Sequence, residues 1–361
     1  MVNTKRINFG FDRFSGLYVW ASFILLFGLL KPAVFLTTNN LFLIASQQVI
    51  AAMLAMAILM PLAAGAYDLS IGANINLAAV LVAVLQVRDG MGMWLSIVVT
   101  IASGVLIGLV NGFLVVKLHV SSFIATLGMA TIISAVLSIV TNNLEPLPVT
   151  SSTWNALTQT KVLGFQIVFW YLIVMALILW WVLEHMPIGR YTYAVGSNPE
   201  AARLSGVRVG RYTWVALTVS GGVSAFAGVC YSSLSGPSLT FGPSLLLPAY
   251  AAAFLGSTQI RPGRFNVLGT MIAVYVLATG VAGVQYLTSV QWLNDMFNGV
   301  ALIFAVAFAV WRQRVNARKG TAHDEVSPLA LADDPEQGIA AIEGRDEEDL
   351  TTDGHVVGPS R

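Results

Sequence analysis

Long apolar windows, separated by short polar breaks, run through most of the chain. A helix needs about 20 residues to cross roughly 30 Å of hydrocarbon. Windows of about this length predict ten transmembrane helices, at 17–34, 41–63, 69–87, 93–116, 121–141, 164–185, 212–234, 243–258, 265–283 and 292–311. The eighth window is short and contains Pro248, so it fits either a full crossing or a broken, re-entrant helix.

The positive charges favour one orientation of these helices. With ten crossings and a cytoplasmic N-terminus, nearly all Lys and Arg residues fall on the cytoplasmic side, and only Lys31, Arg88 and Lys161 lie outside. The same rule favours a full crossing for the eighth window, because Arg261 and Arg264 would otherwise move outside. We therefore expect both termini to be cytoplasmic.

Composition supports an all-α polytopic membrane protein with one membrane domain. The 361 residues are 56% hydrophobic and 10% charged, with a mean hydropathy of +0.75. Residues 1–320 hold 17 Lys and Arg against 7 Asp and Glu, whereas residues 321–361 hold 2 against 11. We predict a cytoplasmic N-terminus over 1–16, a membrane domain over 17–311 and a mostly disordered acidic cytoplasmic tail over 312–361.

A polar interruption at residues 186–211 carries the boundary signals of a separate short helix. Asn198 is a favoured N-cap, Pro199 suits the first helical position and Glu200 lies in the first turn. Gly206 supplies a C-terminal stop. The sequence predicts a cytoplasmic helix of about two turns, which is too short to be stable without a surface to lie against.

Two surfaces suit this short helix. Arg203, Arg208 and Arg211 could rest on the membrane interface, as basic amphipathic segments do. They could equally contact a partner protein. A second loop, residues 142–163, is the longest predicted external segment; it either docks an external partner or covers the helix ends.

The motifs of catalysis are missing from the sequence. No G-x-x-x-x-G-K-[ST] segment is present, so the chain holds no phosphate-binding loop of its own. The four histidines are scattered without metal-ligand spacing. We expect no catalytic residue, no metal, no cofactor bound by this chain and no nucleic-acid partner. Few ionisable groups lie inside the windows, which disfavours an ion-coupled secondary transporter and leaves it as the alternative class.

Polar residues inside or beside the windows are candidates for function. Asp68 and Ser70 precede an apolar helix, where a carboxylate either caps the helix or stabilises a gate. Four neutral residues are candidate translocation-path residues: Gln47, Asn74, Asn76 and Gln285. Further polar residues of the same kind are Gln48, Asn111, Thr126, Ser220 and Asn294. Hydrogen bonding between helices is the alternative role for all of them.

Four ordered segments resemble the signatures of ribose-type ABC transporter permeases. They are GAYDLSIG at 65–72, NGFLVVKLHVSSFIATLG at 111–128, GRYTYAVGSNPEAARLSG at 189–206 and GSTQIRPGRFNVLG at 256–269. The resemblance covers roughly residues 20–312, and the branch also includes branched-chain amino acid permeases.

The resemblance implies a type II ABC importer-like permease in the bacterial plasma (inner) membrane. Such a subunit pairs with a second permease, commonly as a homodimer. It receives a monosaccharide, a ribose- or xylose-like pentose or a hexose, from an extracellular or periplasmic binding protein. A separate cytoplasmic ATPase binds ATP and Mg²⁺ and drives transport. Branched-chain amino acids are the alternative substrate.

The resemblance also assigns the short helix at 198–206 as the coupling helix that docks on the ATPase. The residues carried over to that role are Asn198, Pro199, Glu200, Ala201, Arg203, Leu204 and Gly206.

Overall fold

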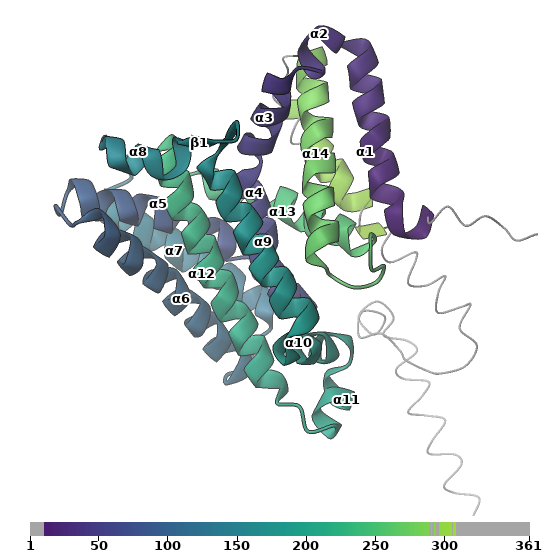
Figure 1. The fold of residues 1–361 in the computed structure, drawn as a ribbon. Helices are drawn as coiled ribbons and strands as arrows, with labels where there is room; N and C mark the ends of the chain where they lie inside the picture. Colours follow the sequence, from purple (N-terminus) through teal and green to yellow (C-terminus); the bar gives the residue numbers. More distant parts are fainter. Residues whose placement is uncertain (1–10, 289, 291, 294–295, 305, 308–361) are drawn as a thin grey trace, which may run out of the picture. The chain divides into compact units, whose positions relative to one another are not determined.

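Most of the described chain is helical (Figure 1). A computed structural model describes residues 11–288, 290, 292–293, 296–304 and 306–307, with only the backbone of 11–13. The helices are α1 (Phe11–Leu30), α2 (Pro32–Phe35), α3 (Thr38–Gln47), α4 (Val49–Ala63), α5 (Ile71–Val87), α6 (Met93–Val116), α7 (Ser122–Thr141), α8 (Ser152–Gln159), α9 (Ile167–His185), α10 (Pro187–Ser197), α11 (Pro199–Leu204), α12 (Val209–Ser235), α13 (Phe241–Ser257) and α14 (Val267–Leu287). The predicted acidic tail and Asn294 lie outside the described residues.

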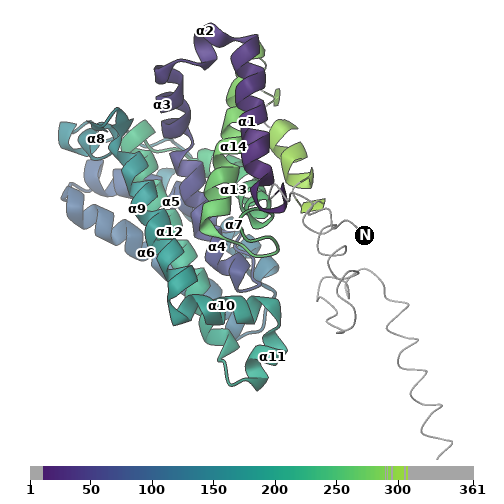
Figure 2. The same ribbon diagram turned by 45° about the vertical axis from the view of Figure 1, so that its right-hand side comes forward.

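The helix α4 forms the centre of the core. All 15 of its residues are buried, which is typical of a helix that is apolar on every side. It contacts α5, α9 and α12 on one side and α13 and α14 on another (Figures 1 and 2). Two groups of helices meet at α4, one containing α5, α6, α7 and α12 and the other containing α1, α13 and α14, and α5 also contacts α13 directly.

Small residues bring α6 and α12 into direct backbone contact. The Cβ of an alanine at Gly108 would lie 2.5 Å from the carbonyl oxygen of Leu217 and 2.7 Å from the Cα of Thr218. A Cβ at Gly104 would lie 2.6 Å from the carbonyl oxygen of Gly221. Glycines spaced by four residues on α6 thus allow the close approach that small residues give helices in membranes.

The predicted windows and the helices agree in part. A helix overlaps each of the first nine windows, and the tenth falls on residues described only in part. Within the described residues, five helices are long and apolar enough to cross a membrane: α6, α7, α9, α12 and α14. Helices α3 and α4 together make a sixth candidate, whereas α5, α13 and the 14–30 part of α1 are shorter apolar helices.

Two predicted windows differ from the helices that occupy them. The window 41–63 contains a bend of 42° between α3 and α4, at Gln48, where a ψ of 0° departs from the helical value. The first helix extends from Phe11 to Leu30 and so begins before the predicted residue 17. It ends before residue 34 because Lys31 precedes Pro32, and a residue before proline disfavours helical geometry. Helix α13 continues through Pro248.

The segment 142–163 folds back over the end of α12. Trp154 of α8 is fully buried, and the Ser233 hydroxyl of α12 donates a 2.6 Å hydrogen bond to its carbonyl oxygen. Strands β1 (Lys161–Val162) and β2 (Phe165–Gln166) follow as an antiparallel hairpin with Lys161 opposite Gln166. These contacts favour a covering role for the segment. It lies at the end of the bundle opposite α10 and α11 (Figures 1 and 2).

The α6–α12 contact predicts different effects for the same substitution at two glycines. Gly108→Ala should destabilise the protein by about 1–3 kcal/mol, because the added methyl group overlaps α12. Gly128→Ala in α7 should be tolerated, because a Cβ there meets nothing within 4 Å. Thermal unfolding of the detergent-solubilised variants measures both. Equal melting temperatures would contradict the proposed contact.

Candidate functional site

A non-helical segment, residues 64–70, separates α4 from α5 inside the helix bundle. Gly65 has a φ of +73°, which glycine adopts more easily than other residues. Four successive backbone N–H groups of the segment donate to side chains: Tyr67 to Ser122 Oγ (3.0 Å), Asp68 to the Tyr250 hydroxyl (3.1 Å), Leu69 to Thr126 Oγ1 (3.0 Å) and Ser70 to Asp68 Oδ1 (3.0 Å). Side chains from α7 and α13 thereby replace the helical hydrogen bonds that the segment lacks.

Asp68 is the acidic centre of this segment, and it is fully buried. Its Oδ1 accepts hydrogen bonds from both the backbone N–H and the hydroxyl of Ser70, the latter at 2.6 Å. Asn111 of α6 donates to the same Ser70 hydroxyl at 2.9 Å. Among the described residues, Oδ2 has no hydrogen-bond partner. The carboxylate thus stabilises the turn before α5 and, through Ser70, joins that turn to α6.

The candidate path residues Asn74 and Asn76 both bond to protein groups in this conformation. The Asn74 amide donates to the Gly221 carbonyl (2.8 Å) and the Ser224 hydroxyl (2.7 Å) of α12. The Asn76 amide donates to the Leu239 carbonyl (2.7 Å), and its oxygen accepts from the Gly242 N–H (2.6 Å). These two side chains therefore connect α5 to α12 and to the start of α13.

Gln47 and Gln285 lie elsewhere. Gln47 ends α3 and Gln285 lies near the end of α14, and both side chains are exposed. The two helices are linked by a 2.6 Å hydrogen bond from the Tyr286 hydroxyl to Asn40. The four predicted path residues are thus not gathered into one polar cluster in this conformation.

The short helix predicted near 198–206 is present as α11. Asn198 is its N-cap, with its side-chain oxygen accepting the Ala201 N–H at 2.9 Å, and Pro199 occupies the first position. At the other end, Gly206 has a φ of +80° and donates to the Arg203 carbonyl, while Val207 donates to the Ala202 carbonyl. This pair of bonds is a Schellman motif.

The outer face of α11 is open to a partner. Leu204 is 85% exposed, the highest value among the large apolar side chains in the described part of the chain. Glu200 and Arg203 form an exposed ion pair at 2.6 Å. Ala202 alone is buried, and it lies on the inner side of α11.

Helix α10 connects α11 to the core at the break after α4. A Cβ at Gly196 would overlap the carbonyl oxygen of Ala63, the last residue of α4. It would also lie 3.0 Å from the backbone nitrogen of Gly65. Helix α10 therefore packs directly against the start of the segment 64–70.

A second contact joins α10 to the loop before α14, and we call it the Tyr193 clasp. The Arg264 guanidinium lies 3.5 Å from the centre of the Tyr193 ring, and the Tyr193 hydroxyl donates to the Phe265 carbonyl at 2.6 Å. Glu184, at the end of α9, pairs with Arg261 and lies 3.9 Å from Arg264. Burial raises the pKa of the Tyr193 phenol, and the Arg264 charge opposes this shift. The phenol therefore stays a neutral donor at physiological pH.

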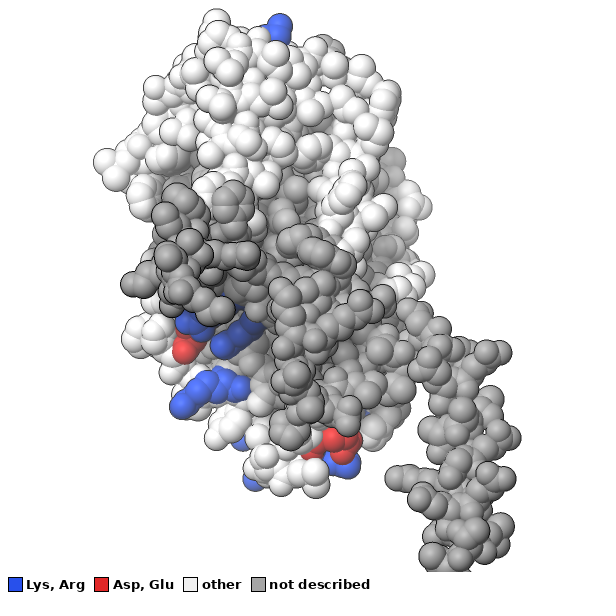
Figure 3. Space-filling view, turned by 90° about the vertical axis from the view of Figure 1, so that its right-hand side faces the viewer, with Lys and Arg blue, Asp and Glu red and all other residues white. Residues whose placement is uncertain are grey.

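Charged side chains are unevenly distributed over the described surface. On the face drawn in Figure 3, most of the Lys and Arg side chains gather towards the lower end, and the broad white area above them carries a blue side chain only at its far top. Lys31 and Lys161 belong to the opposite end, beside α2 and in β1 (Figures 1 and 2). Within the described residues, no group of three or more His, Cys, Asp or Glu could hold a metal ion.

Comparison with protein families gives a match over residues 40–306 to the family described as "Branched-chain amino acid transport system / permease component". The chain belongs to this family. It is therefore a permease component of an ABC transport system, not an enzyme, and the predicted resemblance is confirmed. The family consists of multi-pass inner-membrane proteins, in agreement with the apolar helices. An importer permease of this kind works with an ATPase and a periplasmic binding protein.

Two kinds of curated relatives are similar over most of this permease. The ribose import permease protein RbsC of Escherichia coli (strain K12) is 30% identical over 278 residues, which cover 75% of this chain and 86% of the relative. The autoinducer 2 import system permease protein LsrC of Salmonella typhimurium is 29% identical over 278 residues, which cover 76% and 79%. No solved structure matches the chain.

The residues that stabilise the segment 64–70 and the Tyr193 clasp were mostly not identified from the sequence. Among Ser122, Thr126, Tyr193 and Tyr250, the sequence predicts a role only for Thr126, as a residue of the translocation path. No spacing rule links them to residues so distant in the chain. The one sequence signal for residues that stabilise the segment 64–70 is a neutral polar residue in the first turns of an apolar helix. Ser122 and Thr126 match this signal.

The permease offers a matched pair of threonines on α7 that tests the contact with segment 64–70. Both side chains donate to the carbonyl four residues earlier, but only Thr126 also accepts the Leu69 N–H. Thr126→Ala should cost about 1–3 kcal/mol, because it leaves a donor unpaired. Thr131→Ala should change stability by no more than about 0.5 kcal/mol. Thermal unfolding measures the difference in stability. Equal losses of stability in the two variants would exclude the hydrogen bond between Leu69 and Thr126.

Proposed function

We propose that this permease imports a monosaccharide, a pentose such as ribose or a chemically similar hexose, driven by ATP hydrolysis in a partner subunit. The similarity to ribose and autoinducer 2 import permeases over about three quarters of the chain supports this substrate class. The family description leaves branched-chain amino acids as the second candidate. The described ion pairs lie at helix ends or in loops, which disfavours an ion-coupled carrier with charges in mid-membrane.

The proposed membrane arrangement has ten crossings and cytoplasmic termini. The end of the bundle that contains α10 and α11 carries Arg190, Arg203 and Arg208, as the positive-inside rule requires of a cytoplasmic face. The opposite end, with α8 and the hairpin, then faces the binding protein. Leu144 and Leu147, each 71% exposed, are apolar contact points at that end.

Helix α11 is the proposed docking element for the ATPase. The residues that form it in this role are Asn198, Pro199, Glu200, Ala201, Arg203, Leu204 and Gly206. Capping at both ends and the packing of buried Ala202 against the rest of the chain stabilise the helix in its place. Exposed Leu204 gives it an apolar contact point that a partner surface would cover.

Movement of α11 would reach the core by two routes through α10. Gly196 contacts the end of α4, so it acts on the segment that contains Asp68 and Ser70, the proposed gate element. The Tyr193 clasp acts on the loop before α14. Pairing of two such permeases, as a homodimer, would let one ATPase pair move both protomers. In a transport conformation different from the one described, the sugar path would be lined by Asn74, Asn76, Gln47 and Gln285.

Substitution of the exposed leucine on α11 tests the docking role. Leu204→Glu should abolish ATPase recruitment and reduce ATP-driven sugar uptake at least tenfold, because it introduces a charge at the proposed apolar anchor. Copurification with the ATPase measures recruitment. Uptake of labelled ribose into proteoliposomes, with the binding protein present, measures transport. Leu147→Glu, at the opposite end, is the control for recruitment and should leave copurification unchanged.

The reconstitution also tests the transport class. If uptake persists without ATP and is abolished by an ionophore, transport is driven by an ion gradient and the ABC mechanism is wrong. Normal recruitment of the ATPase by Leu204→Glu would instead remove only the role of α11.

The clasp predicts uncoupling without loss of the ATPase. Arg264→Gln should leave recruitment intact but lower the number of sugar molecules transported per ATP severalfold, since the cation–π and ion-pair contacts with Tyr193 and Glu184 are lost. Arg264→Lys should restore part of the ratio, because lysine also pairs with a ring and a carboxylate. Arg88→Gln removes an exposed ion pair at the other end and is the control. An unchanged ratio in Arg264→Gln would contradict the clasp.

A further inference from the structure

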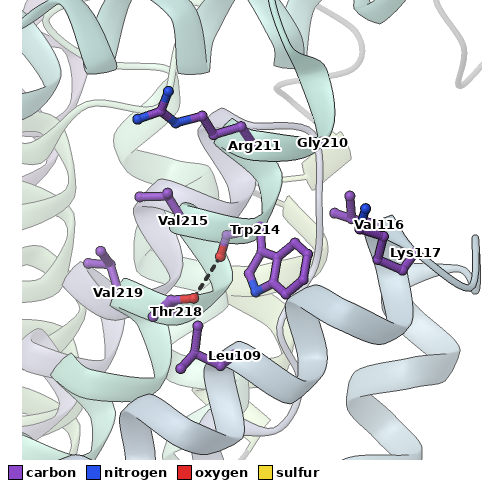
Figure 4. A pocket seen from close by; sticks show the side chains of 9 residues that line it. All are labelled: Leu109, Val116, Lys117, Gly210, Arg211, Trp214, Val215, Thr218 and Val219. Carbon is purple, nitrogen blue, oxygen red and sulfur yellow. Dashed lines mark hydrogen bonds between the residues drawn. The ribbon is translucent and has the colours of Figure 1, made fainter.

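A groove between α6 and α12 has the chemistry of a phospholipid site. It has a volume of about 520 Å³, and its walls are formed mainly by apolar side chains such as Leu109, Val215 and Val219 (Figure 4). Lys117, just after α6, and Arg211, in the first turn of α12, also line it. An apolar floor with two cations is unsuited to a sugar, which needs several polar partners.

The groove continues along the outer surface of α6. A second hollow of about 630 Å³ extends from Val98 to Leu109 and shares Leu109 with the first. From Val98 to Val116 the helix rises roughly 27 Å at 1.5 Å per residue. One leaflet of hydrocarbon is about 15 Å thick, half of the core of a bilayer. The groove is therefore long enough for an extended acyl chain that begins at the Lys117 end.

The two cations lack partners within the described part of the chain. Lys117 and Arg211 are exposed, and within the described residues the side chain of neither forms a hydrogen bond or an ion pair. They come from different helices, and Figure 4 shows the indole of Trp214 between α12 and the Val116–Lys117 end of α6. Trp214 packs on Gly112 and forms an edge contact with Phe113 at 6.3 Å. An amphipathic ring beside cations is typical of the headgroup level of a membrane.

We infer that this α6–α12 groove binds an anionic phospholipid, with its phosphate at Lys117 and Arg211 and an acyl chain along α6. Basic pockets between transmembrane helices at the cytoplasmic surface select anionic headgroups. A second copy of the chain fits the groove less well, because a cation pair at an interface needs an anionic partner. The inference goes beyond the proposed function and rests on that proposal only in that α6 and α12 cross the membrane with Lys117 and Arg211 at its cytoplasmic surface.

Lipid exchange on the full-length protein tests the site. Phosphatidylglycerol should bind more tightly than phosphatidylcholine, as measured by native mass spectrometry and by the rise in melting temperature. The double variant Lys117→Gln/Arg211→Gln should weaken phosphatidylglycerol binding roughly 25-fold, the effect of two cations at an anionic surface, and leave phosphatidylcholine unchanged. Arg190→Gln/Arg208→Gln removes the same charge from exposed positions that do not line the groove, and it should retain the preference.

A second variant tests the acyl part of the site. Val215→Trp narrows the groove between the helices and should weaken phosphatidylglycerol binding without a change in charge. Inorganic phosphate alone should give no stabilisation. The lipid assignment would be overturned if the two double variants lost phosphatidylglycerol binding equally. Stabilisation by inorganic phosphate alone would overturn it too. A lower dimer fraction in Lys117→Gln/Arg211→Gln at constant lipid would assign the groove to a second copy and overturn it as well.

Discussion

The backbone of residues 64–70 must be hydrogen-bonded inside an apolar helix bundle, and much of the structure follows from this requirement. Each N–H without a partner in such surroundings costs free energy comparable to a lost hydrogen bond. The structure supplies acceptors from Ser122 and Thr126 on α7 and from Tyr250 on α13. Two helices that are distant in sequence, α7 and α13, are therefore held at this segment. A segment so fixed can change only when α7 and α13 move with it.

Helix α10 is the only described element of the proposed coupling region that reaches both this segment and the loop before α14. Glycine at 196 lets the backbone of α10 contact the end of α4 directly. A backbone contact transmits displacement with less loss than flexible side chains do, because it has no rotamers to absorb the movement. The clasp around Tyr193 is different, since an ion pair and a ring face can slide before they separate. The two proposed routes thus combine a stiff contact at Gly196 with a more flexible one at Tyr193.

The sequence predicted the local features well and the long-range ones poorly. The limits of α11 depend on Asn198, Pro199 and Gly206, which act within one turn, so they could be read directly. The helix break at Gln48 interrupts a window that hydropathy treats as continuous. Asp68 was recognised as unusual, but its surroundings depend on Asn111 and on Tyr250, which is 182 residues away. A single sequence contains no signal for that pairing, and the role of a buried polar group is decided by its partners.

The α6–α12 groove and the proposed coupling helix, α11, both lie near the start of α12. Leu204 ends α11, α12 begins at Val209, and Arg211 and Trp214 lie in its first two turns. The Gly108 contact prevents α12 from sliding freely along α6, since their backbones touch there. A lipid bound at Arg211 would add a second restraint at the membrane surface. With α12 held at both points, a force on α11 would move α10 in preference to α12, and so would act on α4 and the Asp68 segment.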